Sequence, residues 1–222
     1  MKRLRAALCY LLPLLMIPIA VGVSLQLPTQ YTALMIFIVA ALTLLLFVCG
    51  IEQKAIGTRR LVLSVIFMAL AVLGRMLPMV KPVTAIIILG ALYLGKESGF
   101  LIGAGTALLS NVFFGQGPWT VFQMLAWGCI GWGAGAMHRA LRRHKALLLI
   151  YGCITGIAYS MLMDIWTVVW HYEAFSFKMY RVTLLAALPY TMLYAFSNVL
   201  FLWLMHKPVD EKLSRIEIKY GL

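Results

Sequence analysis

Acidic residues are scarce in this chain, and their scarcity removes most kinds of catalytic site. Only 7 of the 222 residues are Asp or Glu, against 19 Lys or Arg, and they form no DxxD-type cluster. A single acid, Asp164, lies deep within a hydrophobic run, and it has no histidine partner at similar depth. General acid–base catalysis needs positioned groups that exchange protons with a substrate. The sequence therefore predicts that the protein is not an enzyme.

Signatures of metal, redox and nucleotide sites are also missing. The four cysteines are Cys9, Cys49, Cys129 and Cys153. They show neither CxxC nor Cys/His spacing, which indicates small core residues rather than metal ligands. The patterns HExxH, GxSxG and the Walker-type GxxxxGK[S/T] do not occur. We expect no metal and no cofactor, and a partner would have to supply any ATP-driven step.

Hydrophobic residues are what the chain has in abundance. They make up 63% of it, and charged residues only 12%, whereas a soluble domain has roughly 45–50% apolar and about 25% charged residues. This composition indicates an integral membrane protein built from helices of about 20 residues. The net charge of +12 does not suggest nucleic-acid binding, because the basic residues lie between hydrophobic runs rather than along one stripe.

Eight apolar segments predict an all-α membrane protein. They cover residues 6–25, 31–50, 61–78, 82–95, 98–114, 119–137, 146–170 and 180–206. The first could be a signal peptide because basic residues precede it, but its length and the span that follows favour a retained helix. The basic linker IEQKAIGTRR divides a two-span leader (1–60) from a six-span core (61–222). The tail after residue 206 is predicted to form a short interfacial helix.

The distribution of basic residues predicts the orientation in the plasma membrane. With both termini inside, all Lys and Arg residues lie in cytoplasmic segments except Arg75, Lys81, Lys178 and Arg181. Cytoplasmic loops carry an excess of Lys and Arg, so we predict that both termini are cytoplasmic. In this orientation the loops at 75–82, 111–120 and 170–181 face outward and can converge on one outer cavity.

The segment from Gly103 to Trp132 departs most from ordinary membrane-helix composition. It reads GAGTALLSNVFFGQGPWTVFQMLAWGCIGW, so two Gly/Ala-rich runs meet at a corner of amides, hydroxyls and rings. Small residues let helices approach closely, and polar side chains at this depth usually serve function. We predict a binding pocket in which amides orient the ligand and rings stack on it. The candidate contacts are Asn111, Phe114, Gln116, Trp119, Gln123 and Trp127, beside Ser110, Phe113 and Thr120.

Three charged residues are further candidates, each with a structural alternative. Arg75 and Lys81 either extend to the lipid headgroups or form an outward cationic rim that attracts an anionic or amide-rich ligand. Asp164 either contacts the ligand, or pairs with Arg75, Lys81 or Arg181, or forms an ion pair that holds helices together.

One face of the last span carries three polar side chains. Tyr190, Tyr194 and Asn198 are spaced by four residues, so they lie along one side of a helix. We include them among the substrate-binding candidates. The tryptophans have an alternative role as anchors at the membrane interface, and Trp119 is the best candidate for stacking because Gln116 and Gln123 lie close by.

At this corner the chain resembles a known family. The stretch GFLIGAGTALLSNVFFGQGPWTVFQMLAWGCIGWGAG, preceded by LGRMLPMVKPVTAIIILGALYLG and followed at the end of the chain by RIEIKYGL, is similar to the S components of energy-coupling factor (ECF) vitamin transporters. The resemblance covers about residues 61–222. Within that family the chain looks most like the group assigned to cobalamin uptake.

The resemblance implies a function and partners. S components bind a vitamin at their outer face, then dock on a transmembrane coupling subunit driven by two ATPases and carry the vitamin inward, with the subunit toppling in the membrane. Docking uses small residues on the first core helix, often as Ala-x-x-x-Ala. That helix here lacks a strict Ala-x-x-x-Ala, and its small positions are Ser64, Ala69, Ala71 and Gly74.

We therefore predict the substrate-binding subunit of an ABC-type importer with a vitamin, best guessed as cobalamin, as its substrate. One alternative is a small membrane enzyme that acts on a lipid or prenyl substrate through Asp164, His171 and Glu173. Another is a structural subunit in which the polar corner only packs helices together.

Overall fold

The structure is a computed structural model, and it describes residues 57–117, 119–172 and 176–220, together with Ile38 and Leu42. The described part is all-helical, as predicted. Its helices are α3 (Thr58–Met76), α4 (Val83–Leu94), α5 (Lys96–Phe114), α6 (Trp119–Ala136), α7 (His138–Arg143), α8 (Lys145–Tyr172) and α9 (Phe177–Tyr220).

Proline and glycine define the breaks between the helices of the core. α3 ends before Leu77, whose extended backbone leads into Pro78, and α4 begins directly after Pro82. Gly95 and Gly115 have φ values of 91° and 93°, a conformation that glycine adopts without steric cost, and they separate α4 from α5 and end α5. Each predicted span from residue 61 onward therefore has a helix at its place. The loop expected after residue 137 contains the short helix α7.

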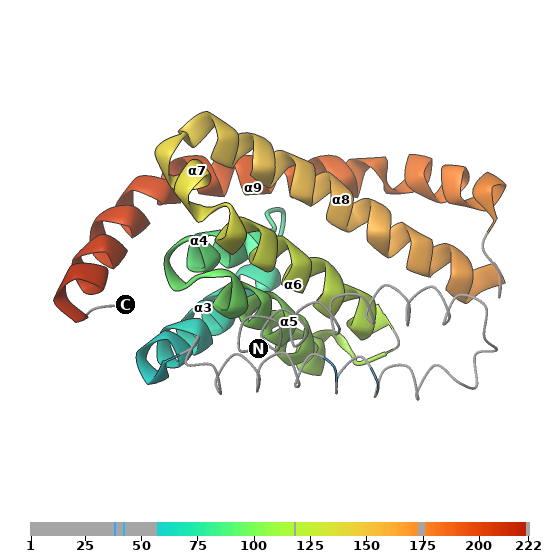
Figure 1. Ribbon diagram of the computed structural model, residues 1–222. Helices are drawn as coiled ribbons and strands as arrows, with labels where there is room; N and C mark the ends of the chain where they lie inside the picture. Colours follow the sequence, from blue (N-terminus) through green and yellow to red (C-terminus); the bar gives the residue numbers. More distant parts are fainter. Residues whose placement is uncertain (1–37, 39–41, 43–56, 118, 173–175, 221–222) are drawn as a thin grey trace, which may run out of the picture.

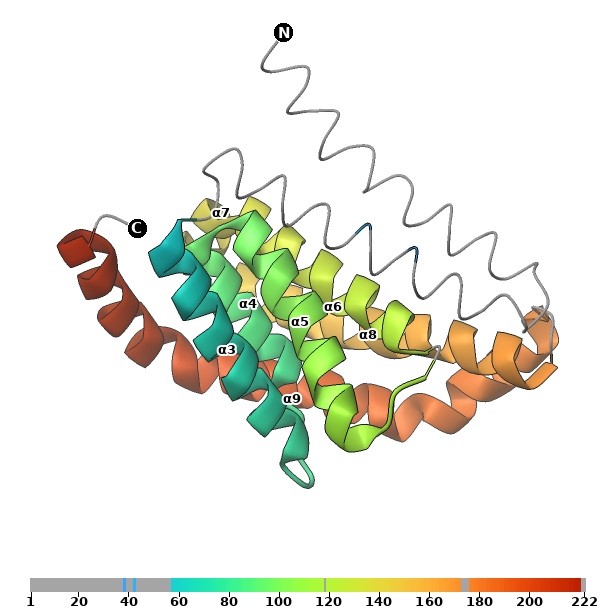
Figure 2. The ribbon, with the colours of Figure 1, turned by 90° about the horizontal axis from the view of Figure 1, so that it is seen from below.

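α4 is the centre of the bundle. Helices α3, α5 and α6 run side by side, and α4 packs against all three and against α9 (Figure 2). Every α4 residue except Ile86 is buried. Helices α8 and α9 form a long antiparallel pair on the other side and extend past the ends of α3–α6 (Figure 1).

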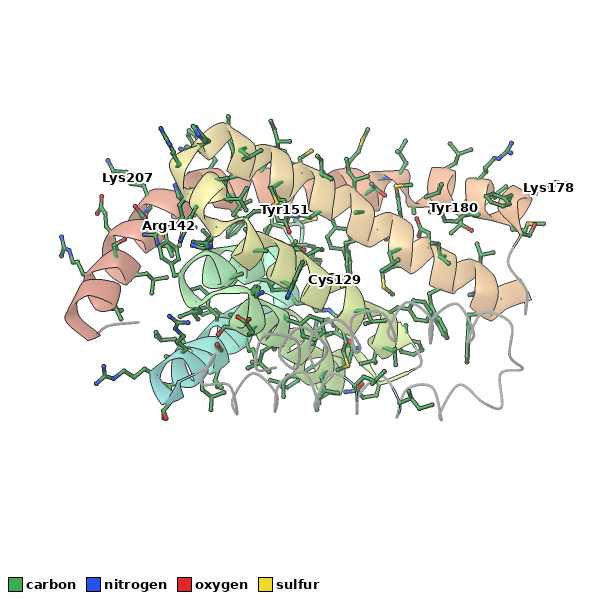
Figure 3. The ribbon with its side chains drawn as sticks, viewed as in Figure 1. Cys129, Arg142, Tyr151, Lys178, Tyr180 and Lys207 are labelled. Carbon is green, nitrogen blue, oxygen red and sulfur yellow. The ribbon has the colours of Figure 1, made fainter. Side chains whose placement is uncertain are left out.

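The bundle has two chemically different ends. We call them the Arg75 end, where α3 and α5 finish, and the Arg142 end, where α7 lies. Figure 3 shows Arg142 and Lys207 at one end of the α8–α9 pair and Lys178 and Tyr180 at the other.

Glycines bring α5 and α6 into backbone contact. A Cβ on Gly103 would overlap the carbonyl oxygen of Trp127, and Gly99 and Gly131 are in the same position relative to each other's carbonyl oxygens. No side chain separates the helices at these points, as expected for small residues at membrane-helix interfaces. The pair therefore forms a tightly fixed support for the polar residues at its Arg75 end.

The C-terminal tail differs from the expected separate interfacial helix. α9 continues through Pro208 to Tyr220, and Leu213 is buried in the core cluster with Val209 and Ile216 packed around it. Tyr93 on α4 donates a hydrogen bond of 2.6 Å to Asp210 Oδ1. Apolar contacts and this bond hold the tail against the bundle.

Within the described residues, three helices are long and apolar enough to cross a membrane: Lys96–Phe114, Lys145–Val168 and Phe177–Ile216. The shorter helix Val83–Leu94 is also apolar. The predicted spans at 6–25 and 31–50 lie outside the described residues, apart from Ile38 and Leu42, and Leu42 packs against the core. The division into a two-span leader and a six-span core stays a prediction.

Candidate functional site

Arg75 connects α3 to the polar end of α5. Its Nη1 atom donates hydrogen bonds to Ser110 Oγ and, at 2.6 Å, to Asn111 Oδ1. Both acceptors are fully buried and neutral. The sequence predicted that Arg75 and Asn111 belong to one site, and the structure brings them into direct contact.

Asn111 connects Arg75 to α6 through two further hydrogen bonds. Its Nδ2 atom donates to Thr120 Oγ1 and to Gln123 Oε1, both at 2.8 Å. Because Arg75 can only donate, the Asn111 oxygen must face Arg75 and the nitrogen must face α6. The guanidinium therefore sets the orientation of the amide at the centre of the site.

The network then reaches α8 and α9. Gln123 Nε2 donates to Tyr159 OH at 3.3 Å, and the Tyr159 ring stacks on Trp127, with centroids 4.9 Å apart and an angle of 5° between the planes. Tyr194 meets the Tyr159 ring edge-on at 5.2 Å. Five helices thus contribute to one cluster, which we call the Arg75 cluster: Arg75, Ser110, Asn111, Phe114, Thr120, Gln123, Trp127, Tyr159 and Tyr194.

Aromatic rings surround the guanidinium. Its Cζ atom lies 4.6 Å from the centroid of Phe114 and 5.4 Å from that of Trp127, distances at which cation–π attraction operates. Trp127 is only 1% exposed, whereas Phe114 is 49% exposed. Trp127 is therefore part of the buried wall of the site, and Phe114 presents a ring at its edge.

Gln116 and Trp119 lie at the loop between α5 and α6. Gln116 accepts a hydrogen bond from Thr120 Oγ1 at 3.0 Å and donates to the carbonyl of Leu108 at 2.8 Å, so it braces the loop while remaining exposed. Trp119 begins α6, is partly exposed, and lies over Gly117. Both border the Arg75 cluster.

Lys81 has a different place from the one expected for a rim cation. Its Nζ atom donates to the carbonyl oxygens of Leu77 at 3.0 Å and Arg75 at 3.2 Å, and its backbone N–H donates to Ser197 Oγ. These bonds satisfy carbonyl groups at the C-terminal end of α3, where a cation is favourable. Lys81 therefore holds the backbone that carries Arg75.

The three polar residues on α9 do not act as one face. Tyr190 is 67% exposed, while Asn198 is fully buried and donates to the Gly152 carbonyl oxygen at 3.0 Å. Only Tyr194, between them, reaches the Arg75 cluster. The reason is that α9 runs past the ends of α3–α6, so successive turns meet different surroundings.

Asp164 is not paired with Arg75 in the structure. Among the residues that the structure describes, it forms no ion pair with Arg75, Lys81 or Arg181, and its buried Oδ2 atom has no hydrogen-bond partner. Ser160, one turn earlier on α8, bonds to Thr191 of α9, which indicates that this face of α8 meets α9 rather than the site. The predicted pairing of Asp164 across the cavity is not present.

The groups of the alternative enzymatic site are not assembled in the described part of the chain. His171 is exposed and its Nδ1 atom lies 3.0 Å from the Thr167 carbonyl oxygen, while Glu173 is outside the described residues. The structure shows no cluster of three or more His, Cys, Asp or Glu side chains within the residues it describes.

Sequence reasoning did not include Tyr159 among the site residues. It lies in the run AYSMLMD, where nothing in the local pattern distinguishes it from an interface aromatic. The helical spacing could have indicated that Tyr159 faces the bundle, because Tyr159, Trp166 and Trp170 lie along one side of α8. In the structure Trp166 on this side contacts Phe122 of α6.

The small residues of α3 face two ways. Ser64, Ala71 and Gly74 are buried against the bundle, so they are not accessible to a partner in this structure. Ala69 alone is exposed, within an apolar stripe of large side chains formed by Val62, Val65, Ile66, Leu70 and Leu73. Of the four small residues predicted to form a docking surface, only Ala69 is accessible in this structure, and its role in docking stays a prediction.

An apolar groove lies beside this stripe. Its volume is about 290 Å³, and it is lined by side chains of α3, α4 and α9, among them Phe67, Leu73, Ile86 and Phe201. It has almost no polar lining, so it lacks the groups that would orient a vitamin.

Comparison with known proteins gives one family. The model of the family described as ECF-type riboflavin transporter, S component, matches residues 48–207, which is most of the chain. Searches of curated proteins and of solved structures give no match. The family supports the resemblance to S components, but not the assignment to the cobalamin group. The chain belongs to the ECF-type riboflavin transporter S components, and is thus a multi-pass plasma-membrane protein and the substrate-specific subunit of a vitamin transporter rather than an enzyme.

Proposed function

We propose that this subunit captures a flavin vitamin, riboflavin or a close derivative, at the Arg75 cluster. The observation that carries the proposal is the convergence of five helices on one network of hydrogen-bonding and aromatic side chains at the Arg75 end. The family description names riboflavin, and for this reason a flavin replaces cobalamin as the proposed ligand.

The chemistry of the cluster suits a flat ligand with polar edges. Phe114 and Trp119 are partly exposed rings at its border, and a ring system gains contact area by stacking on such side chains. Gln116 and Tyr190 add exposed polar groups close to the same end of the bundle. In a ligand site of this kind, rings supply affinity and a few polar groups fix orientation.

In the proposed orientation the Arg75 end faces outward and the Arg142 end faces the cytoplasm. Exposed basic residues gather at the Arg142 end: Arg139 and Arg143 lie on α7, and Lys207 lies at the same end of the α8–α9 pair (Figure 3), as expected of a cytoplasmic face. We propose that the transmembrane coupling subunit, driven by two ATPases, docks on the apolar stripe of α3 around Ala69. The subunit then delivers the vitamin inward.

Binding of purified protein tests the proposal. The protein in detergent is titrated with riboflavin, thiamin and cobalamin, and quenching of flavin or tryptophan fluorescence is followed. We expect sub-micromolar affinity for riboflavin, and a loss of at least about tenfold for Gln123→Leu, which removes the hydrogen bonds of Gln123 to Asn111 and Tyr159.

A matched control is Trp203→Phe, an exposed aromatic position on α9 beside Lys145, which should leave riboflavin affinity unchanged. Folded wild-type protein that binds none of the three vitamins would contradict the proposal. Binding of cobalamin in preference to riboflavin would instead restore the assignment that the sequence suggested.

A further inference from the structure

Arg75 is a half-buried cation whose guanidinium contacts only neutral groups among the residues that the structure describes. Its hydrogen-bond partners are a hydroxyl and an amide oxygen, its ring contacts are Phe114 and Trp127, and the nearby tyrosines Tyr159 and Tyr194 carry no charge at neutral pH. No carboxylate lies within ion-pair distance of it in the part of the chain that the structure describes. A buried charge without a counter-charge is costly.

No described carboxylate is paired with Arg75. Glu97 lies 3.9 Å from Lys96, and Asp210 accepts from Tyr93 and lies 3.5 Å from Arg142. All of these belong to the Arg142 end. Asp164 faces the contact between α8 and α9. Within the residues that the structure describes, therefore, no side chain neutralises Arg75, and the site is open to a negative charge from a bound molecule.

The unused N–H donors of the Arg75 guanidinium indicate which chemical group that molecule carries. Both described hydrogen bonds are made by Nη1, while Nε and Nη2 make no hydrogen bond with any residue that the structure describes. A guanidinium has five N–H donors in one plane. The Nε and Nη2 groups lie on the same edge, and two parallel N–H donors on one edge match the two oxygens of a carboxylate or a phosphate.

The surroundings hold this edge in place. Ser110 and Asn111 fix one side of the guanidinium, Phe114 and Trp127 lie against it, and Lys81 anchors the Arg75 carbonyl. The guanidinium is thus oriented before a ligand arrives, which lowers the entropy cost of binding.

We propose that Arg75 is a specificity residue that binds an oxyanion, a carboxylate or a phosphate, carried by the ligand. This inference rests on the proposed function, since it concerns the same site. It means that the subunit prefers the anionic form of a vitamin over its neutral counterpart. For flavins, riboflavin 5′-phosphate binds more tightly than riboflavin.

The test compares matched ligands. Affinities of the purified wild-type protein are measured for riboflavin 5′-phosphate and riboflavin, nicotinate and nicotinamide, and pantothenate and pantothenol. We expect at least about tenfold tighter binding of the anionic member of the pair that binds, because a charge-assisted bidentate contact is strong. The identity of that pair separates phosphate from carboxylate recognition.

Variants assign the preference to Arg75. In Arg75→Gln the ratio of the two affinities falls to about one, and in Arg75→Lys, which keeps the charge but loses the two-donor edge, it falls part of the way. A purely structural role would lower both affinities and leave their ratio unchanged. Equal wild-type affinities within the pair that binds overturn the inference while leaving flavin capture intact.

If the proposed flavin binding is wrong, the same affinity measurements give a different result. If neither flavin binds but nicotinate or pantothenate binds more tightly than its neutral partner, flavin capture is wrong and the role of Arg75 stands. If no anionic ligand binds more tightly than its neutral partner, the role of Arg75 is wrong. If Arg75→Gln does not fold, the wild-type pairs and Arg75→Lys still decide the outcome.

Discussion

Arg75 Nη1 lies 2.6 Å from Asn111 Oδ1, and this one contact joins α3 to α5 and fixes the direction of every amide that follows it. Asn111 then uses both of its N–H donors on α6, one on Thr120 and one on Gln123. The network is therefore ordered from the cation outward. Its central member, Asn111, has no N–H donor left over.

Replacing Asn111 by Ala is expected to destabilise the protein by about 2–3 kcal/mol, because buried partners on Arg75, Thr120 and Gln123 lose their bonds together. Thermal unfolding in detergent measures the change. Val112→Ala, at the next position on α5, is the control, because Val112 is 69% exposed, and its effect should stay within about 0.5 kcal/mol. Equal effects of the two substitutions would mean that the network is not buried as described.

Lys81→Met tests whether Lys81 anchors α3 or contacts ligand. Loss of the bonds to the Arg75 and Leu77 carbonyls should cost about 1 kcal/mol, which lowers the melting temperature by roughly 2–4 °C. Lys178→Met, at an exposed position on α9, should not change it. An unchanged melting temperature together with a large fall in riboflavin affinity would instead indicate that Lys81 contacts the ligand at the rim of the site.

Gly103→Ala is expected to cost at least about 1–3 kcal/mol, because the added methyl group meets the backbone of Trp127 and the helices α5 and α6 must separate. Gly57→Ala provides the comparison, since a Cβ at Gly57 meets nothing within 4 Å. Fluorescence-detected size-exclusion chromatography after heating reports both. A thermostable Gly103→Ala variant would contradict the backbone contact.

Tyr93→Phe is expected to loosen the end of α9. The substitution keeps the ring over which Arg142 lies and removes the hydrogen bond to Asp210, and a bond to a charged group contributes about 1.5–3 kcal/mol. Limited trypsin digestion should then cleave faster after Lys212 and Arg215, which lie beyond that bond. Tyr180→Phe, at the other end of the α8–α9 pair, should leave the cleavage rate as in the wild type.

The helices of the core could be predicted from sequence because their boundaries are marked by chemistry. Long apolar runs stop at Pro78, Gly95 and Gly115 or at groups of basic residues, so α3–α6 and α8 start and end within a few residues of their predicted positions. The end of α9 could not be predicted in this way. Pro208 and the charged residues after it resemble a helix end, but Leu213 finds an apolar site on the bundle that overrides them.

The site could be predicted in part. Asn111, Phe114, Gln123 and Trp127 stand close together in the sequence, so their density in one corner was visible. Which way each helix faces was not visible, because it depends on partners distant in the chain. For that reason the sequence did not predict that Ser64 and Ala71 of α3 lie in the core, or that Tyr159 of α8 belongs to the site.

Tyr194 in the Arg75 cluster and Asp210 in the contact with Tyr93 belong to the same helix, roughly four turns apart. A straight helix that is held at two points moves as one body, unless it bends between them. Pro208 lies just before Asp210 and lacks the N–H that would stiffen this turn. Pro208 therefore marks a point at which α9 can bend, between the part that carries Tyr194 and the part that Tyr93 of α4 holds through Asp210.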